Sequence, residues 1–334
     1  MTDPAPATPP RPRRWHRVAV RLVVLGAIVW WVARSTDLEA FGRVLARLPL
    51  TIGVLALAIA MGNMLLAGLR WRALMVAFGA RDLPPLAVLV RLFLVGQFYN
   101  TFVPGSVGGD VVRGAVSRAC FESGTASYAV VVSERLLGLS ALGIIFLAGF
   151  AVGPSIVDLG EIWPWIAAAI GLGVAVLAVG RLGNRLSRIW ARIPRITAPR
   201  AVVTAFGISL LGHGLTLVIF WLLAQGLVIE VSFAALALVV PLGLVASILP
   251  IAIAGIGPRE AALVGLLGLL GVAHASALAL SLTFAAVLIA LATLGGLLQL
   301  GWGVQMASTS TPSEVAVPSA SPPGVGTIGE GDSG

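Results

Sequence analysis

Apolar runs recur along the whole chain and are separated by short polar or charged stretches. An α-helix needs about 20 mainly apolar residues to cross the hydrocarbon core of a bilayer. The pattern therefore predicts an all-α polytopic membrane protein with about eight transmembrane helices. These helices are predicted at 18–33, 50–69, 86–103, 126–152, 163–179, 201–223, 233–253 and 275–302.

Two apolar stretches are interrupted, at 104–110 and at 255–260. Each interruption contains glycines, a proline, an acid and an arginine, and short helices are predicted after them at 111–121 and 261–270. Lipid cannot satisfy the amide groups of non-helical backbone, so such a break survives only inside protein or along a wet cavity. Two re-entrant broken-helix segments, related by an inverted repeat, are one interpretation. The alternative is two helix–loop–helix turns at the membrane interface.

Six charged residues lie at or near these breaks. Asp110 and Arg113 are three residues apart, so they share a helix face and can pair. Arg259 and Glu260 are adjacent, so we expect that they do not face each other and that each needs another partner. We expect the partners to be Glu134 and Arg135, at the start of the next long helix.

Composition supports the membrane interpretation, with 58% hydrophobic and only 11% charged residues, against about 25% charged in soluble domains. The net charge is +8 and every basic residue is an arginine. These arginines lie in short loops, as membrane topology requires, so they do not indicate nucleic-acid binding. They predict a cytoplasmic N-terminus in the cell membrane, with the loops around 70–81 and 181–200 also cytoplasmic. We expect a disordered tail at 1–17, a membrane domain at 18–304 and a second disordered tail at 305–334.

No catalytic constellation is recognisable, so we expect a non-enzyme. The Gly108-Gly109-Asp110 triplet suggests an intramembrane aspartyl protease, but no second aspartate lies within a predicted span. We expect no metal and no cofactor, because His213 and His274 are not at ligand spacing. The single cysteine, Cys120, excludes an intrachain disulfide and a multi-cysteine metal site.

Three segments resemble the lysylphosphatidylglycerol synthase transmembrane region, also called the flippase-like domain family. The stretch 96–113 carries Asn100, Pro-Gly, Gly-Gly-Asp and an arginine in the family's order. The segments Glu-Arg-Leu at 134–136 and Gly-Ile-Gly-Pro-Arg-Glu-Ala at 255–261 are similar to two further family motifs. Gly138 departs from the pattern, because the family often has Asp there. We expect no soluble synthetase domain after the membrane region, so the resemblance implies the translocating part alone.

The resemblance implies a lipid flippase-like transporter that moves a phosphate-containing headgroup between leaflets. Arg113 and Arg259 would hold the phosphate, and the acids would orient the arginines or meet a cationic headgroup. The candidate substrate-binding residues are Arg113, Arg259, Asp110, Glu260, Glu134, Arg135 and Asn100. The residues expected to shape the breaks are Pro104, Gly105, Gly108, Gly109, Gly255 and Gly257.

Two other functions stay open at this point. One is the handling of a polyprenyl phosphate carrier in cell-envelope glycan assembly, which uses the same phosphate chemistry. The other is a non-transporting scaffold or accessory subunit. Expected partners are a membrane phospholipid or a polyprenyl phosphate, and a separate synthetase or glycosyltransferase.

Overall fold

A computed structural model describes residues 38–102, 108–122, 124–152, 196–247 and 257–308, and every regular element in them is a helix. Residues up to Gln299 form one compact unit and those from Leu300 form another. The elements of the first unit are α2 (Leu38–Leu45), α3 (Leu50–Ala77), α4 (Leu86–Phe102), α5 (Gly108–Ser117), η1 (Arg118–Cys120), α6 (Gly124–Val152), α9 (Pro199–Gly226), α10 (Phe233–Ala246), α11 (Pro258–Leu269) and α12, which begins at His274.

The described helices repeat one order of lengths. In the first half a 28-residue helix (α3) is followed by two short helices (α4, α5) and a 29-residue helix (α6). In the second half a 28-residue helix (α9) is followed by two short helices (α10, α11) and the long α12. In each half the two short helices flank one of the breaks seen in the sequence.

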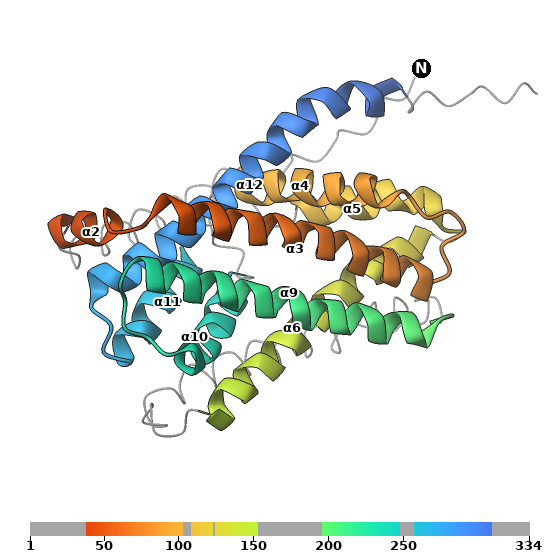
Figure 1. Ribbon diagram of the computed structural model, residues 1–334. Coiled ribbons are helices and arrows are strands. Elements are labelled where there is room, and N and C mark those ends of the chain that lie inside the picture. The colour runs from red at the N-terminus through yellow and green to blue at the C-terminus, as the bar shows by residue number, and fades with distance from the viewer. Residues whose placement is uncertain (1–37, 103–107, 123, 153–195, 248–256, 309–334) are drawn as a thin grey trace, which may run out of the picture. The chain divides into compact units, whose positions relative to one another are not determined.

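The two leading helices, α3 and α9, lie side by side and run in opposite directions (Figure 1). Asn63 near the middle of α3 donates to Thr216 of α9 at 3.2 Å. Towards the end of α3, the Ala77 carbonyl accepts a 2.8 Å hydrogen bond from the Thr197 amide, just before α9 begins. Residue numbers therefore rise along α3 as they fall along α9, which fixes an antiparallel register.

The halves interleave through glycine contacts. In α6, a Cβ added at Gly149 would lie 2.8 Å from the Ala237 side chain, so α6 packs tightly on α10 of the other half. In α12, a Cβ added at Gly295 would fall on the Leu94 carbonyl oxygen of α4. Each half thus places its last helix against the first short helix of the other half.

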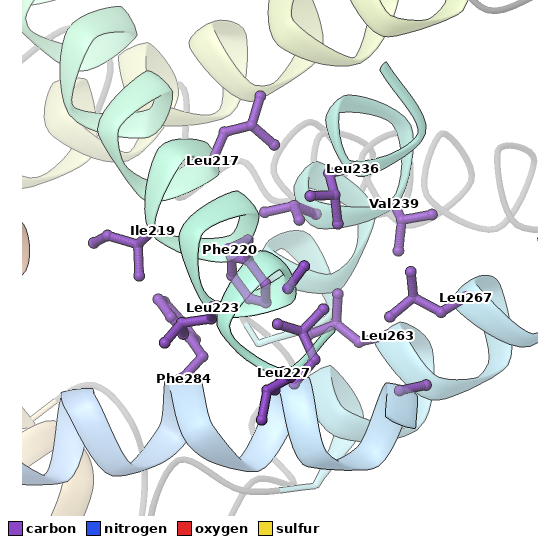
Figure 2. Close-up of a cluster of buried hydrophobic side chains, with 14 of the residues drawn as sticks. Leu217, Ile219, Phe220, Leu223, Leu227, Leu236, Val239, Leu263, Leu267 and Phe284 are labelled. Carbon is purple, nitrogen blue, oxygen red and sulfur yellow. The ribbon is translucent and has the colours of Figure 1, made fainter. Parts of the chain in front are cut away.

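The main hydrophobic core lies where α9, α10, α11 and α12 meet. Figure 2 shows Phe220 and Leu223 of α9 facing Leu263 of α11 and Phe284 of α12. The rings of Phe220 and Phe284 are 4.3 Å apart between centroids. Burial of these side chains holds α11 in place, and it positions the charged first turn of α11 described below.

Four described helices are long and apolar enough to cross a membrane. Much of their apolar surface is not covered by protein: the side chain of Leu147 is 62% exposed and that of Val203 is 70% exposed. An exposed surface of this kind requires lipid as its solvent. The chain is a multi-pass membrane protein. The four helices are Leu50–Ala77, Thr125–Val152, Pro199–Gly226 and His274–Gln299.

The second predicted span was too short. We expected it to end at residue 69 with Arg70 in a cytoplasmic loop, but α3 continues to Ala77 and keeps Arg70 inside the helix. Arg70 belongs in the helix because a buried carboxylate balances its charge. The spans predicted at 18–33 and 163–179 lie outside the described residues.

Candidate functional site

The two short helices of the first half form a tight hairpin. A Cβ added at Gly109 of α5 would lie 2.5 Å from the Gly96 carbonyl oxygen of α4 and 2.9 Å from Asn100 Oδ1. Asn100 Oδ1 accepts the Gly109 amide at 3.0 Å and so caps an amide at the start of α5. Beyond α5, the Cys120 carbonyl accepts the Arg81 amide at 3.0 Å, so the hairpin returns to the end of α3 where it began.

This hairpin carries Asp110 and Arg113 into a buried ionic network. Arg113 Nη2 donates to Asp110 Oδ1, which confirms the pair predicted from their spacing. Arg113 Nη1 also lies 3.2 Å from Glu134 Oε2 on α6. All three side chains are less than 10% exposed. Burial of paired charges holds the network together, because removing one partner strands another in a low-dielectric site.

Two further arginines complete the network from opposite sides. Arg70 of α3 donates to Glu134 Oε1 and, at 3.4 Å, to Ser209 Oγ of α9. Arg135 of α6 donates to Asp110 Oδ2, with Nε at 2.9 Å. The side chain of Arg70 is 17% exposed, whereas that of Arg135 is 48% exposed. These five groups, which we call the first network, are Arg70, Asp110, Arg113, Glu134 and Arg135.

Aromatic rings enclose Arg113. Its guanidinium carbon lies 4.1 Å from the centroid of the Phe93 ring and 5.0 Å from that of Trp71. Such cation–π contacts attract the guanidinium electrostatically, most strongly where water is excluded. Together with its two carboxylates, they leave Arg113 enclosed by protein. Arg135 is the most exposed member of the first network.

The second break places Arg259 and Glu260 together, which corrects our expectation that neighbours on a helix do not pair. Arg259 Nε donates to Glu260 Oε1 at 2.9 Å, and the guanidinium lies 5.2 Å from the Phe284 ring centroid. Glu260 Oε2 meanwhile accepts the Gly257 amide at 2.6 Å. Because Glu260 folds back over the helix N-terminus to cap it, the long arginine side chain can reach it.

We had expected Glu134 and Arg135 to be the partners of Arg259 and Glu260, and this expectation is wrong. Glu134 and Arg135 pair within the first network instead. Gly257 has φ of 139°, a conformation that L side chains rarely adopt, so glycine is required there. Gly108 opens α5. Pro104, Gly105 and Gly255 lie outside the described residues.

A polar stripe extends from the first network between α3 and α9. Asn63 pairs with Thr216, and Arg70 meets Ser209, about two helical turns away. His213 lies between these contacts, with Nε2 3.4 Å from where a Cβ on Gly138 of α6 would stand. Polar side chains inside apolar spans usually have a partner or a function. An acid at position 138, as the resemblance leads one to expect, would lie against His213.

Sequence reasoning missed Arg70 and Ser209. One signal for Arg70 was available in the sequence. The arginine directly follows the apolar run that ends at residue 69, and a helix that extended past this residue would include it. No group of three histidine, cysteine or acidic side chains that could hold a metal occurs among the described residues.

Comparison with known proteins identifies a family that covers most of the chain. The family model described as "Lysylphosphatidylglycerol synthase TM region" matches residues 18–296, which is most of the chain. No curated protein matches the chain. The matched region contains both short-helix pairs and the whole first network. The chain belongs to the lysylphosphatidylglycerol synthase transmembrane-region family.

Proposed function

We propose that the protein is a lipid transporter that moves a phosphate-containing headgroup between the two leaflets. The observation that carries this proposal is the half-exposed guanidinium of Arg135 on a membrane-spanning helix. At a rise of about 1.5 Å per residue, Arg135 lies about 16 Å along the helix axis from Gly124, the first residue of α6. Asp110 already pairs with this cation, but about half of the Arg135 side chain remains exposed, and charged residues at such a depth usually mark a substrate pathway.

The surroundings of Arg135 suit a lipid. Val132, Leu136 and Leu139 of the same helix are 49%, 48% and 39% exposed, so apolar surface flanks the charge. Acyl chains match this surface, and a phosphate matches the planar guanidinium, which binds phosphate oxygens in a bidentate manner. Arg113 and Arg259 are enclosed, so in this proposal Arg135 makes the first contact. The other charges set its position.

The arrangement of the halves supports movement rather than static binding. Each half has a pair of short helices at a break, and the leading helices α3 and α9 are antiparallel. Interrupted helices in corresponding positions of two inverted halves are a feature of transporters. In this proposal both short-helix pairs are re-entrant, and the halves are related by inverted topology. The protein performs no chemical step on the lipid.

The proposal places the protein in the cell membrane with its N-terminus in the cytoplasm. Arg81, Cys120 and Thr197 meet at one end of α3, and the adjoining sequence stretches 70–81 and 181–200 carry nine of the 22 arginines. Arginine-rich short loops remain on the cytoplasmic side. A separate synthetase or glycosyltransferase would supply or consume the lipid.

Headgroup translocation in proteoliposomes tests the proposal. Labelled phosphatidylglycerol, an aminoacylated analogue and a short polyprenyl phosphate would be compared, using the wild type, Arg135→Gln and Arg72→Gln. Arg72 is an exposed arginine of α3, so its variant removes the same charge away from the network. We expect protein-dependent movement of at least one lipid, lost in Arg135→Gln and kept in Arg72→Gln. Folded wild type that moves none of the three lipids would contradict transport and favour an accessory role.

A further inference from the structure

We infer that the polar stripe between α3 and α9 is a hydrated proton-binding site centred on His213, and that it couples lipid movement to a proton gradient. This inference rests on the proposed function, because it names the ion that drives the same transporter. The stripe consists of Asn63, Ser209, His213 and Thr216, which lie beside the first network and are not members of it.

One face of α3 and one face of α9 form the stripe. Asn63 and Arg70 are seven residues apart on α3, which places them two turns apart on the same side of the helix. Ser209, His213 and Thr216 follow one another at intervals of four and three residues, so they share one side of α9. The hydrogen bonds from Asn63 to Thr216 and from Arg70 to Ser209 join the two faces. His213 therefore lies within a polar interface about 10 Å long.

Gly138 of α6 leaves room beside the imidazole. A Cβ on this glycine would stand 3.4 Å from His213 Nε2, so the ring nitrogen faces α6 where α6 has no side chain. Gly138 follows Glu134 by four residues, so both lie on the same face of α6. The Glu134 carboxylate is thus one helical turn from the point where α6 meets His213.

Buried polar atoms on both sides of His213 call for water. In the described part of the chain, Asn63 Oδ1, Arg70 Nε and Glu134 Oε2 are buried and have no hydrogen-bond partner. Glu134 Oε2 lies 3.2 Å from Arg113 Nη1, but it accepts no hydrogen bond from it. Unpaired buried polar atoms are costly, and ordered water is their usual partner in a polar interior. Water bonded to these atoms reaches His213 from both directions and gives a proton a path to it.

Histidine is the side chain that exchanges a proton near neutral pH. Its unprotonated ring nitrogen accepts a proton from hydronium, which leaves a water molecule and adds one positive charge to the imidazole. Three described helices pack against α9, namely α3, α6 and α10. Of these, α3 brings Arg70 and α6 brings Glu134 towards the stripe, whereas α10 has no titratable residue. The arginine opposes a positive charge on the imidazole, and the carboxylate favours it.

This balance links the proton to the lipid. A headgroup phosphate that binds arginines of the first network brings a negative charge towards the stripe and offsets the repulsion by Arg70. His213 then binds a proton more readily. Coupling between two ligands is reciprocal, so the protonated imidazole also strengthens phosphate binding. Lipid and proton therefore cross the membrane in the same direction.

Proton uptake on lipid binding tests this linkage without transport. The purified full-length protein, in a neutral detergent and weak buffer at about pH 6.5, receives short-chain phosphatidylglycerol, its aminoacylated analogue or a short polyprenyl phosphate. Protein-free mixtures correct for protons that the lipids release. We expect the wild type to take up as much as about one proton per chain with at least one lipid, and His213→Gln to take up none.

Two further variants locate the effect. His274→Gln is the matched control, because it removes the other histidine of the described residues, at the start of α12, and it should take up protons like the wild type. Asn63→Leu removes one water-binding oxygen from the stripe and should lower the uptake. This variant decides the role of the stripe if His213→Gln does not fold.

A pH gradient across proteoliposomes tests the direction of coupling. With the membrane potential held at zero and one proton per lipid, a gradient of about one pH unit should shift the final lipid distribution up to about tenfold towards the alkaline side. The wild type and His274→Gln should show this shift, and His213→Gln should not.

The outcomes separate this inference from the transport proposal. A wild type that takes up no proton with any of the three lipids would overturn the inference, and so would uptake that His213→Gln retains in full. Proton uptake without translocation would support the proton site and contradict transport. Translocation whose final distribution ignores the gradient would contradict the coupling and leave the transport proposal standing.

Discussion

Arg70 lies seven residues before the end of a membrane-spanning helix and depends on two later helices for its partners. Glu134 of α6 supplies the balancing charge, and Ser209 of α9 supplies a hydroxyl. The Arg70 Nε is buried without a hydrogen-bond partner in the described part of the chain, so its fit is already incomplete. A residue of this kind makes a large contribution to stability only while its carboxylate is present.

A double-mutant cycle measures this dependence. Arg70→Gln and Glu134→Gln should each lower the free energy of unfolding by about 3 kcal/mol, because each strands a buried charge. The double variant should lose less than the sum, with a coupling of about 1–3 kcal/mol. Thermal or denaturant unfolding of the purified protein in detergent gives these values.

The ion pair between Arg43 and Glu39 on α2 is the control, since these side chains are 59% and 84% exposed. Its cycle should show no measurable coupling. Additive effects at Arg70 and Glu134 would show that the two charges do not depend on each other.

Sequence alone predicted one part of the first network and not the rest. Asp110 and Arg113 were predictable because three residues along a helix return to the same face. Arg70 and Glu134 are 64 residues apart, and no local rule connects them. The Arg259–Glu260 pair was mispredicted because the rule for neighbours ignores a side chain that folds back to cap its own helix.

At the scale of elements, α12 crosses α4 at two glycines. A Cβ added at Gly295 would fall on the Leu94 carbonyl oxygen. A Cβ added at Gly296 would lie 2.7 Å from the Phe98 ring. Beside this crossing, Arg91 of α4 donates to the Leu298 carbonyl at 2.8 Å. Within a membrane, apolar burial contributes little to the association of helices. Small residues favour association because they allow the backbones to approach closely.

Gly295→Ala should therefore destabilise the protein by about 1–3 kcal/mol, because α12 must move away from α4. Gly207→Ala is the matched control, since a Cβ at that position of α9 has nothing within 4 Å. It should be neutral or stabilise by about 0.5–1 kcal/mol, because alanine favours the helix. Unfolding of both variants in detergent compares them, and an equal effect of the two substitutions would contradict the close crossing.

The elements themselves were largely predictable, because apolar length and the glycine breaks are local signals. The predicted helices at 86–103 and 126–152 agree closely with α4 and α6. The end of α3 was misplaced because charge was taken to end a span. Packing between α12 and α4 was not predictable, since Gly295 and Leu94 are brought together only by the fold.

At the scale of the whole molecule, Cys120 reports which side of the membrane the first hairpin ends on. It is the chain's single cysteine, lies just after α5 and is half-buried. A membrane-impermeant maleimide should label it from the cytoplasmic side and not from outside intact cells. Labelling from outside would invert the proposed orientation.

The rate of this labelling should depend on pH in a defined direction. Burial raises the pKa of the Cys120 thiol, and the Asp82 carboxylate raises it further. The thiolate is the reactive species, so the rate should still be rising at a pH where an ordinary exposed thiol has levelled off. Asp82→Asn removes the second cause and should make labelling faster at neutral pH.

The long separation between Arg70 and its carboxylate has a consequence for biosynthesis. Glu134 is made 64 residues after Arg70, which at about 5–20 residues per second is a delay of roughly 3–13 s. During that time α3 carries an arginine without its carboxylate, seven residues from the end of the helix, where a long side chain can still reach the interface. Because α3 is strongly apolar by itself, we expect it to insert before α6 emerges, and Arg70 to turn inward only once Glu134 has arrived.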